Sequence, residues 1–149
     1  MSAGEYCNRE VVIVARSESI REAIDLMRHY HVGDVVVVEK RGEAPVPVGI
    51  LTDRDIVLEV LAEDVDLDAV TIGDVMSFEL VTVPEDTPLL DSLAIMGEKG
   101  VRRLPVVTAA GELTGILTVD DVLELLAEQL NDLVRLLNRE RRHETRHRK

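Results

Sequence analysis

A seven-residue string occurs twice in this chain, and this duplication restricts the folds that the sequence can adopt. The string "GILTDRD" occupies residues 49–55, and "GILTVDD" occupies residues 115–121. The longer segments 11–38 and 80–107 align at an offset of 69 residues, with matching apolar positions along much of their length. An internal repeat of this kind indicates two copies of one supersecondary unit that bury their apolar faces against each other.

Both copies contain the same predicted order of elements. In the first, a β-branched run at 11–14 precedes a helical period whose apolar side chains share one face: Ile20, Ala23, Ile24 and Met27. The continuously apolar run 35–38 is typical of a strand buried on both faces. A brief strand and a second helix, from about Asp53, complete the unit. We therefore predict an α/β fold of tandem β-α-β-β-α repeats packed about a pseudo-twofold axis.

These repeats divide the chain into four predicted segments. The first repeat occupies residues 8–65, and an acidic linker with the start of the second repeat occupies 66–79. The second repeat occupies 76–129, and residues 130–149 form a helical extension with a basic tail.

The last predicted helix has a leucine seam. Its residues recur at spacings of three and four, as in a coiled coil: Leu123, Leu126, Leu130, Leu133 and Leu137. This face either covers the sheets of its own domain or contacts a second molecule. A second apolar stripe, Leu125, Val134 and Leu136, favours the contact with a second molecule, and we predict a homodimer.

Composition and charge exclude several classes of function. The net charge is −12 and the chain has no Trp, so nucleic acids and anionic membranes are disfavoured as partners. The tail at 135–149 is the exception, with seven Lys/Arg and two Glu. The N-terminus has no secretory pattern and no apolar run is long enough for a membrane span, which predicts a cytoplasmic protein.

These features together resemble a tandem CBS domain pair, the module named after cystathionine β-synthase. The resemblance is carried by Gly-apolar-x-Thr-x-x-Asp before a helix in both copies, by "TIGDVMS" and by "VRRLPVV", and it covers about residues 8–129. It implies sheets inside and helices outside. It also implies clefts for adenosine-containing ligands (AMP, ADP, ATP, NAD or S-adenosylmethionine) and regulation of a partner protein that the sequence does not identify.

The paired strings supply the candidate ligand groups. Thr118 and Asp121, and likewise Thr52 and Asp55, stand where a predicted strand ends and a helix begins. A helix N-terminus attracts phosphate, and the resemblance implies that the aspartate accepts hydrogen bonds from a ribose diol. The alternative is structural: Thr-x-x-Asp is also a pattern that caps a helix without any ligand.

The two copies differ beside these motifs. The second has Arg102 and Arg103 where the first has Gly33 and Asp34. Arginines at these positions are suited to bidentate phosphate binding; alternatively, they form a solvated edge or ion pairs with the acidic body. The first copy offers Arg54 instead, between two acids. We therefore expect unequal sites, with the second motif the better one.

The resemblance also implies which residues receive the base. In related modules the base lies against the backbone at the start of the opposite repeat. Glu10 and Val12 would then serve the second motif, and Val81 the first.

Nothing in the sequence assembles a catalytic or metal site. His143 and His147 have the i, i+4 spacing of metal ligands but lack an accompanying carboxylate motif, and Cys7 is predicted to be inert. We therefore predict a non-enzymatic regulatory module that requires no cofactor and binds an adenine nucleotide as ligand. The alternatives are a dimerising interaction protein with an empty pocket, and a nucleic-acid binder that acts through the tail.

Overall fold

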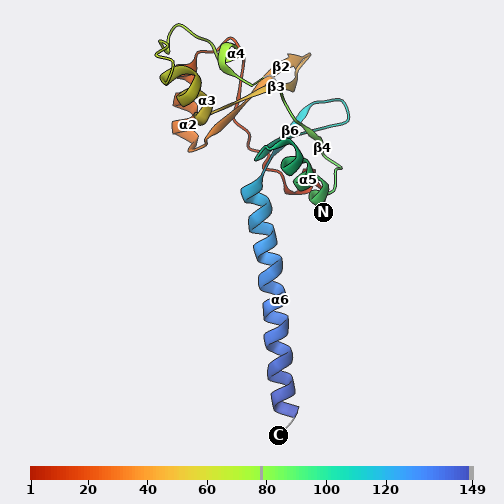
Figure 1. Ribbon diagram of the computed structural model, residues 1–149. Coiled ribbons are helices and arrows are strands. Elements are labelled where there is room, and N and C mark those ends of the chain that lie inside the picture. The colour runs from red at the N-terminus through yellow and green to blue at the C-terminus, as the bar shows by residue number, and fades with distance from the viewer. Residues whose placement is uncertain (78, 148–149) are drawn as a thin grey trace.

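The computed structural model describes residues 1–77 and 79–147, and it contains two similar α/β units with a long helix extending from the second (Figure 1). The first unit consists of β1 (Ile13–Val14), α2 (Ile20–Tyr30), β2 (Asp34–Arg41), β3 (Ala44–Thr52), α3 (Asp53–Ile56) and the π-helical segment η1 (Val57–Leu61). The second consists of β4 (Val83–Pro84), α5 (Leu89–Lys99), β5 (Arg103–Val107), β6 (Leu113–Thr118) and α6 (Val119–His147). The predicted order β-α-β-β-α is confirmed in both units.

Each unit has a three-stranded mixed sheet. The first strand is parallel to the second, and the second is antiparallel to the third, giving the orders β1-β2-β3 and β4-β5-β6. The register shifts once in each hairpin, between Val37 and Val38 in one unit and between Val106 and Val107 in the other. The duplication therefore extends to the irregularities of the sheets.

Three apolar clusters hold the units together. One lies inside each unit, and the helical face predicted for the first copy contributes to it through Ile20, Ala23 and Met27. The third cluster joins the two sheets, with Val36 and Val38 from β2 against Ile116 from β6. Val35–Val37 are completely buried, as expected for a strand covered on both faces.

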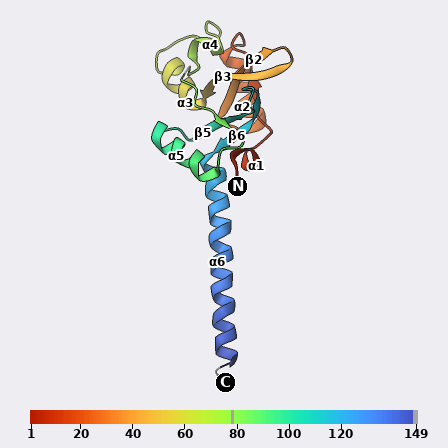
Figure 2. The same ribbon diagram turned by 90° about the vertical axis from the view of Figure 1, so that its right-hand side faces the viewer.

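Two short helices exchange places between the repeats. Helix α1 (Ala3–Tyr6) precedes the first repeat but packs on the second, where the Ala3 amide donates to the Thr87 carbonyl at 2.8 Å. Helix α4 (Ile72–Val75) lies in the segment predicted as a linker, and it packs into the core of the first repeat. Helix α1 contacts β6 and α5; Figure 2 shows α1 at the end of the body where α6 emerges, and α4 at the opposite end of the body. The exchange ties each repeat to the chain segment that precedes the other.

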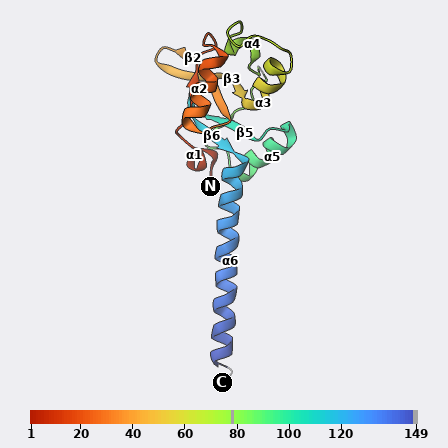
Figure 3. The same cartoon turned by 90° about the vertical axis from the view of Figure 1, so that its left-hand side faces the viewer.

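Helix α6 begins in the second repeat and then leaves it. Val122 is buried, whereas Leu123 is 57% exposed and Leu130 is 63% exposed. In the three ribbon views no other segment accompanies the helix beyond its first turns (Figures 1–3). The interpretation in which the leucine seam covers the domain's own sheets is therefore wrong.

Candidate functional site

The junction between β3 and α3 is a complete capping box. The Asp55 amide donates to the Thr52 hydroxyl at 3.1 Å, and the Thr52 amide donates to the Asp55 carboxylate at 2.9 Å. Both polar groups of the first motif thus satisfy the start of the helix. In the first repeat the geometry is the one that the capping interpretation of Thr-x-x-Asp requires.

The equivalent junction between β6 and α6 is only half closed. The Asp121 amide donates to the Thr118 hydroxyl at 3.2 Å. In the part of the chain that the structure describes, no hydrogen bond returns from the Thr118 amide to the Asp121 carboxylate. That carboxylate instead lines a hollow with Tyr6, Cys7 and Asn8. The second motif therefore leaves one strong acceptor free of its helix cap.

The glycine of each motif is needed because another backbone segment crosses it. A Cβ on Gly115 would lie 2.7 Å from the Asn8 carbonyl oxygen, and one on Gly49 would lie 2.9 Å from the Ser77 carbonyl oxygen. At the crossing over Gly115, the Asn8 and Ile116 backbones exchange two hydrogen bonds of 2.9 Å. This contact fixes the segment from Asn8 onward beside the start of α6.

The predicted base-binding residues Glu10 and Val12 lie on that same segment. They line a hollow with Leu26 and Tyr30 of α2, and Asn8 also lines it. Because Asn8 lines both this hollow and the one beside Asp121, the two hollows are neighbours. The structure thus brings the second motif close to the segment that the sequence assigned to it.

The other residues predicted to serve the first motif are Val81 and Arg54. Val81 stands just before β4 and packs, partly buried, against the core of the second repeat. Arg54 is exposed on α3.

The two predicted phosphate-binding arginines lie beside the second motif. Arg103 is opposite Thr118 in the β5–β6 ladder. The Arg102 carbonyl accepts a hydrogen bond of 2.9 Å from the amide of Val119, the first residue of α6. The Arg102 side chain is largely exposed, 3.9 Å from Asp120. The Arg102 side chain therefore lies exposed beside this helix N-terminus, in a long ion pair with Asp120.

Arg103 is already engaged by the other repeat. Its guanidinium forms an ion pair with Asp34, the residue at the equivalent position of the first repeat. This is the ion pair with the acidic body that the sequence left open as an alternative. Since equivalent positions meet here, the pseudo-twofold axis passes between the two side chains. Burial raises the pKa of Asp34 above its usual value, although the Arg103 charge opposes that shift.

Asn8 and Asp34 were not among the predicted site residues. Each had a signal in the sequence. Residues 2–8, "SAGEYCN", align with "TIGDVMS" at the same offset of 69, and Asp34 aligns with Arg103. Both residues would have been found by extending the repeat alignment to the N-terminus and asking which equivalent positions carry opposite charges.

The remaining chemical candidates are Cys7 and the pair formed by His143 and His147. Burial raises the pKa of the Cys7 thiol, which disfavours a reactive thiolate. Among the side chains that the structure describes, no cluster of three or more His, Cys, Asp or Glu is placed to hold a metal ion. The His147 side chain, part of the predicted His143 pair, lies outside the described residues. None of the helices within the described ranges is long and apolar enough to cross a membrane.

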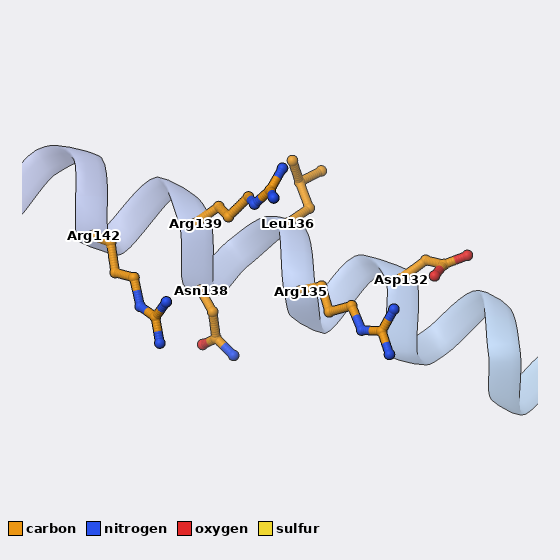
Figure 4. A pocket seen from close by; sticks show the side chains of 6 residues that line it. All are labelled: Asp132, Arg135, Leu136, Asn138, Arg139 and Arg142. Atoms are coloured by element: carbon orange, nitrogen blue, oxygen red, sulfur yellow. The ribbon is translucent and has the colours of Figure 1, made fainter.

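A separate hollow lies on α6, away from both motifs. Its lining comes entirely from one helix: Asp132, Arg135, Leu136, Asn138, Arg139 and Arg142. Figure 4 shows these side chains spread over both sides of the ribbon, with Arg135, Asn138 and Arg142 on one side. Because no second element supplies a wall, this surface does not have the enclosure of a small-molecule site.

Comparisons with known proteins show which proteins this chain resembles in sequence and in fold. An uncharacterized protein of Methanopyrus kandleri is 37% identical over 125 residues, which cover 84% of this chain and 62% of that protein. A CBS domain pair in complex with 5′-methylthioadenosine and S-adenosyl-L-methionine has a TM-score of 0.73 at 25% identity, covering 87% of this chain and 98% of that one. A hexameric CBS-CP12 protein from bloom-forming cyanobacteria has a TM-score of 0.73 at 26% identity, covering 83% and 66%. This chain spans less than two thirds of the length of the Methanopyrus protein.

A profile of the CBS domain matches residues 3–62 and 72–128, which include both short helices that exchange between the repeats. The matched ranges contain both Thr-x-x-Asp junctions and the segment that crosses them. The chain belongs to the CBS domain family, as a tandem pair.

Proposed function

We propose that this protein is a non-enzymatic sensor that binds an adenosine-containing ligand at the second motif. The observation that carries the proposal is the Asp121 carboxylate, which is released from its helix cap and faces a hollow beside Asn8. A carboxylate in this position can accept hydrogen bonds from both hydroxyls of a ribose. The solved CBS pair with two adenosyl ligands supports this ligand class.

The charges around the second motif favour a particular orientation of the ligand. Glu124 and Glu128 share the hollow with Asp121 and repel phosphate there. Arg102 and Arg103 lie on the other side of the junction, at the start of α6. We infer that the ribose binds Asp121, the base lies along the Glu10–Val12 backbone and any phosphates extend toward the arginines.

The ion pair between Asp34 and Arg103 provides a route for signalling. It joins β2 of one repeat to β5 of the other. A phosphate that binds Arg103 competes with Asp34 for the guanidinium, so anionic ligands would favour a different arrangement of the repeats. Different affinity for two arrangements is what a ligand needs in order to shift the balance between them. The regulated protein is then one that contacts both repeats.

Calorimetric titration of the full chain tests the proposal with AMP, ATP, NAD, S-adenosylmethionine and 5′-methylthioadenosine. Asp121→Asn keeps the side-chain shape and removes the charge, and we expect it to weaken binding about 10- to 100-fold. The matched control is Asp55→Asn at the equivalent junction, which should leave the dissociation constant within about threefold. Folding of both variants is checked by circular dichroism. Failure of every ligand to saturate at millimolar concentration, or an equal loss in both variants, would contradict the proposal.

The exposed leucines of α6 favour a second candidate, a dimerising interaction protein without nucleotide. Both candidates include a homodimer. Absorbance at 260 nm of the freshly purified protein separates them, because a chain without Trp and with two Tyr absorbs weakly in the ultraviolet. A ligand retained through purification gives an excess at 260 nm that disappears after unfolding and dialysis.

A further inference from the structure

The part of α6 that leaves the body presents a broad apolar stripe. Seven residues recur at intervals of three and four along one side: Leu123, Leu126, Ala127, Leu130, Leu133, Val134 and Leu137. The leucines and the valine among them are 42–63% exposed. A stripe of this width is the face that a helix normally buries. Most of the stability of a helix in a protein comes from packing its amphipathic face, so this projecting face indicates a missing partner.

The charges of α6 are divided sharply along its length. Residues 119–134 contain no Lys or Arg and five acids: Asp120, Asp121, Glu124, Glu128 and Asp132. Residues 135–147, the rest of α6, contain five Arg and two Glu. The first part of the helix therefore has a net charge of −5 and the second of +3.

We propose that α6 packs antiparallel against α6 of a second copy, with the two helices crossing at Leu130. This arrangement places the acidic start of each α6, residues 119–125, beside residues 135–141 of its partner, which contain three Arg and one Glu. A parallel pair would instead place like charges together along the whole helix, which is unfavourable. The proposal specifies how the homodimer is held together and does not depend on nucleotide binding.

The antiparallel register also matches the apolar stripe. With Leu130 facing its own counterpart, Leu123 faces the partner's Leu137. The stripe is symmetric about Leu130, so it is buried from end to end. The same register sets the partner's Arg139 level with Asp121 and the partner's Arg142 level with Thr118, where α6 begins. The basic tail then lies along the acidic body of the other copy, and the two bodies stand at opposite ends of the paired helices.

Cysteine cross-linking distinguishes the two directions. Leu123 and Leu137 are 14 residues apart, or about 21 Å along a helix, whereas a disulfide requires Cα atoms within about 7 Å. The native thiol is first removed with Cys7→Ser. We expect a mixture of the Leu123→Cys and Leu137→Cys chains to form a mixed disulfide dimer under mild oxidation, and Leu123→Cys alone to stay largely uncross-linked. Leu90→Cys is the control, because Leu90 lies on α5 with 62% exposure.

The results separate this proposal from the homodimer itself. Self-cross-linking of Leu123→Cys as efficient as that of the mixture would overturn the antiparallel arrangement in favour of a parallel one. A dimer in sedimentation equilibrium with no cross-link at either position would place the interface elsewhere and overturn the role of α6, while the homodimer stands. A monomer at all concentrations would contradict both.

Charge reversal provides a second measurement. Arg141→Glu together with Arg142→Glu removes most of the positive charge of the tail. In the antiparallel pair this change sets acids beside acids, and we expect dimer dissociation to become at least tenfold easier by sedimentation equilibrium at low salt. In a parallel pair the same change relieves repulsion between the two tails, so tighter association of the variant would overturn the proposal.

Discussion

The two strand-to-helix junctions have nearly the same sequence and different local chemistry. At the first, the Asp55 carboxylate accepts a hydrogen bond from the Thr52 backbone and is committed to the capping box. At the second, the Asp121 carboxylate lines a hollow beside Asn8. The same four-residue pattern thus closes a capping box in one repeat and leaves the carboxylate outside such a box in the other. A repeated motif identifies where a site can form, and the hydrogen bonds of each copy show which carboxylate is left uncommitted.

The largest effect on stability is expected at a feature that both junctions share. In each, another backbone segment crosses over the glycine of the motif. Gly115→Ala places a Cβ 2.6 Å from the Cys7 sulfur and 2.7 Å from the Asn8 carbonyl oxygen. Because one of these neighbours is backbone, relief requires the crossing segment to move. We expect a loss of about 1–3 kcal/mol in the free energy of unfolding, measured by urea denaturation.

Two other glycines make this test comparative. Gly49→Ala should destabilise the first repeat to a similar extent, because its Cβ would lie 2.8 Å from the Met76 sulfur and 2.9 Å from the Ser77 carbonyl oxygen. Gly97 is the control: it lies in α5 with nothing within 4 Å of the added Cβ. Gly97→Ala should stabilise the protein by about 0.5–1 kcal/mol. If Gly115→Ala were as stable as the parent protein, the crossing would be looser than described.

The next prediction distinguishes the two junctions by how much each aspartate contributes to the free energy of unfolding. Asp55→Ala removes the acceptor of the Thr52 amide, and we expect it to cost about 1 kcal/mol in unfolding free energy. Asp121→Ala loses no such bond and should cost a few tenths of a kcal/mol at most. This order is the reverse of the order expected for ligand binding. Equal losses of stability would show that both carboxylates act as caps in solution.

Much of the fold follows from patterns that the sequence displays directly. The duplicated string, the helical period around Ile20 and the apolar run 35–38 each correspond to a described element with the expected burial. Local pattern is sufficient here because each element buries one face of regular spacing. The exchange of α1 and α4 between repeats was not predicted, because four-residue helices leave almost no periodic signal.

The contacts of the candidate site were harder to predict from the sequence than the fold was. Spacing brought Thr118, Asp121 and Arg103 to one place, because strand pairing and the helix start are local. The partner of Arg103 is Asp34, 69 residues earlier in the chain, and only the packing of two repeats about an axis brings them together. Likewise, a backbone crossing with Ile116 brings Asn8 to the hollow that Asp121 also lines. Long-range contacts across a pseudo-symmetric interface have no signature in local composition.

The smallest effect concerns the ion pair between Asp34 and Arg103, which joins the two repeats. Burial raises the pKa of Asp34 above its usual value of 3.8, and the Arg103 charge only partly opposes this. The folded protein therefore holds the Asp34 proton more tightly than the unfolded chain does. Stability from this group is present at low pH and is lost as the pH rises through the raised, folded-state pKa.

Asp34→Asn abolishes this dependence. Relative to the parent protein, we expect the variant to gain unfolding free energy as the pH rises from about 3 to about 7, as measured by urea denaturation at several pH values. Arg103→Gln is the opposing control, because removing the guanidinium leaves the buried carboxylate without its cation and steepens the loss of stability with pH. If Asp34→Asn instead lost stability as the pH rose, attraction to Arg103 would outweigh burial. The ion pair would then lock the repeats together rather than release Arg103 to an anionic ligand.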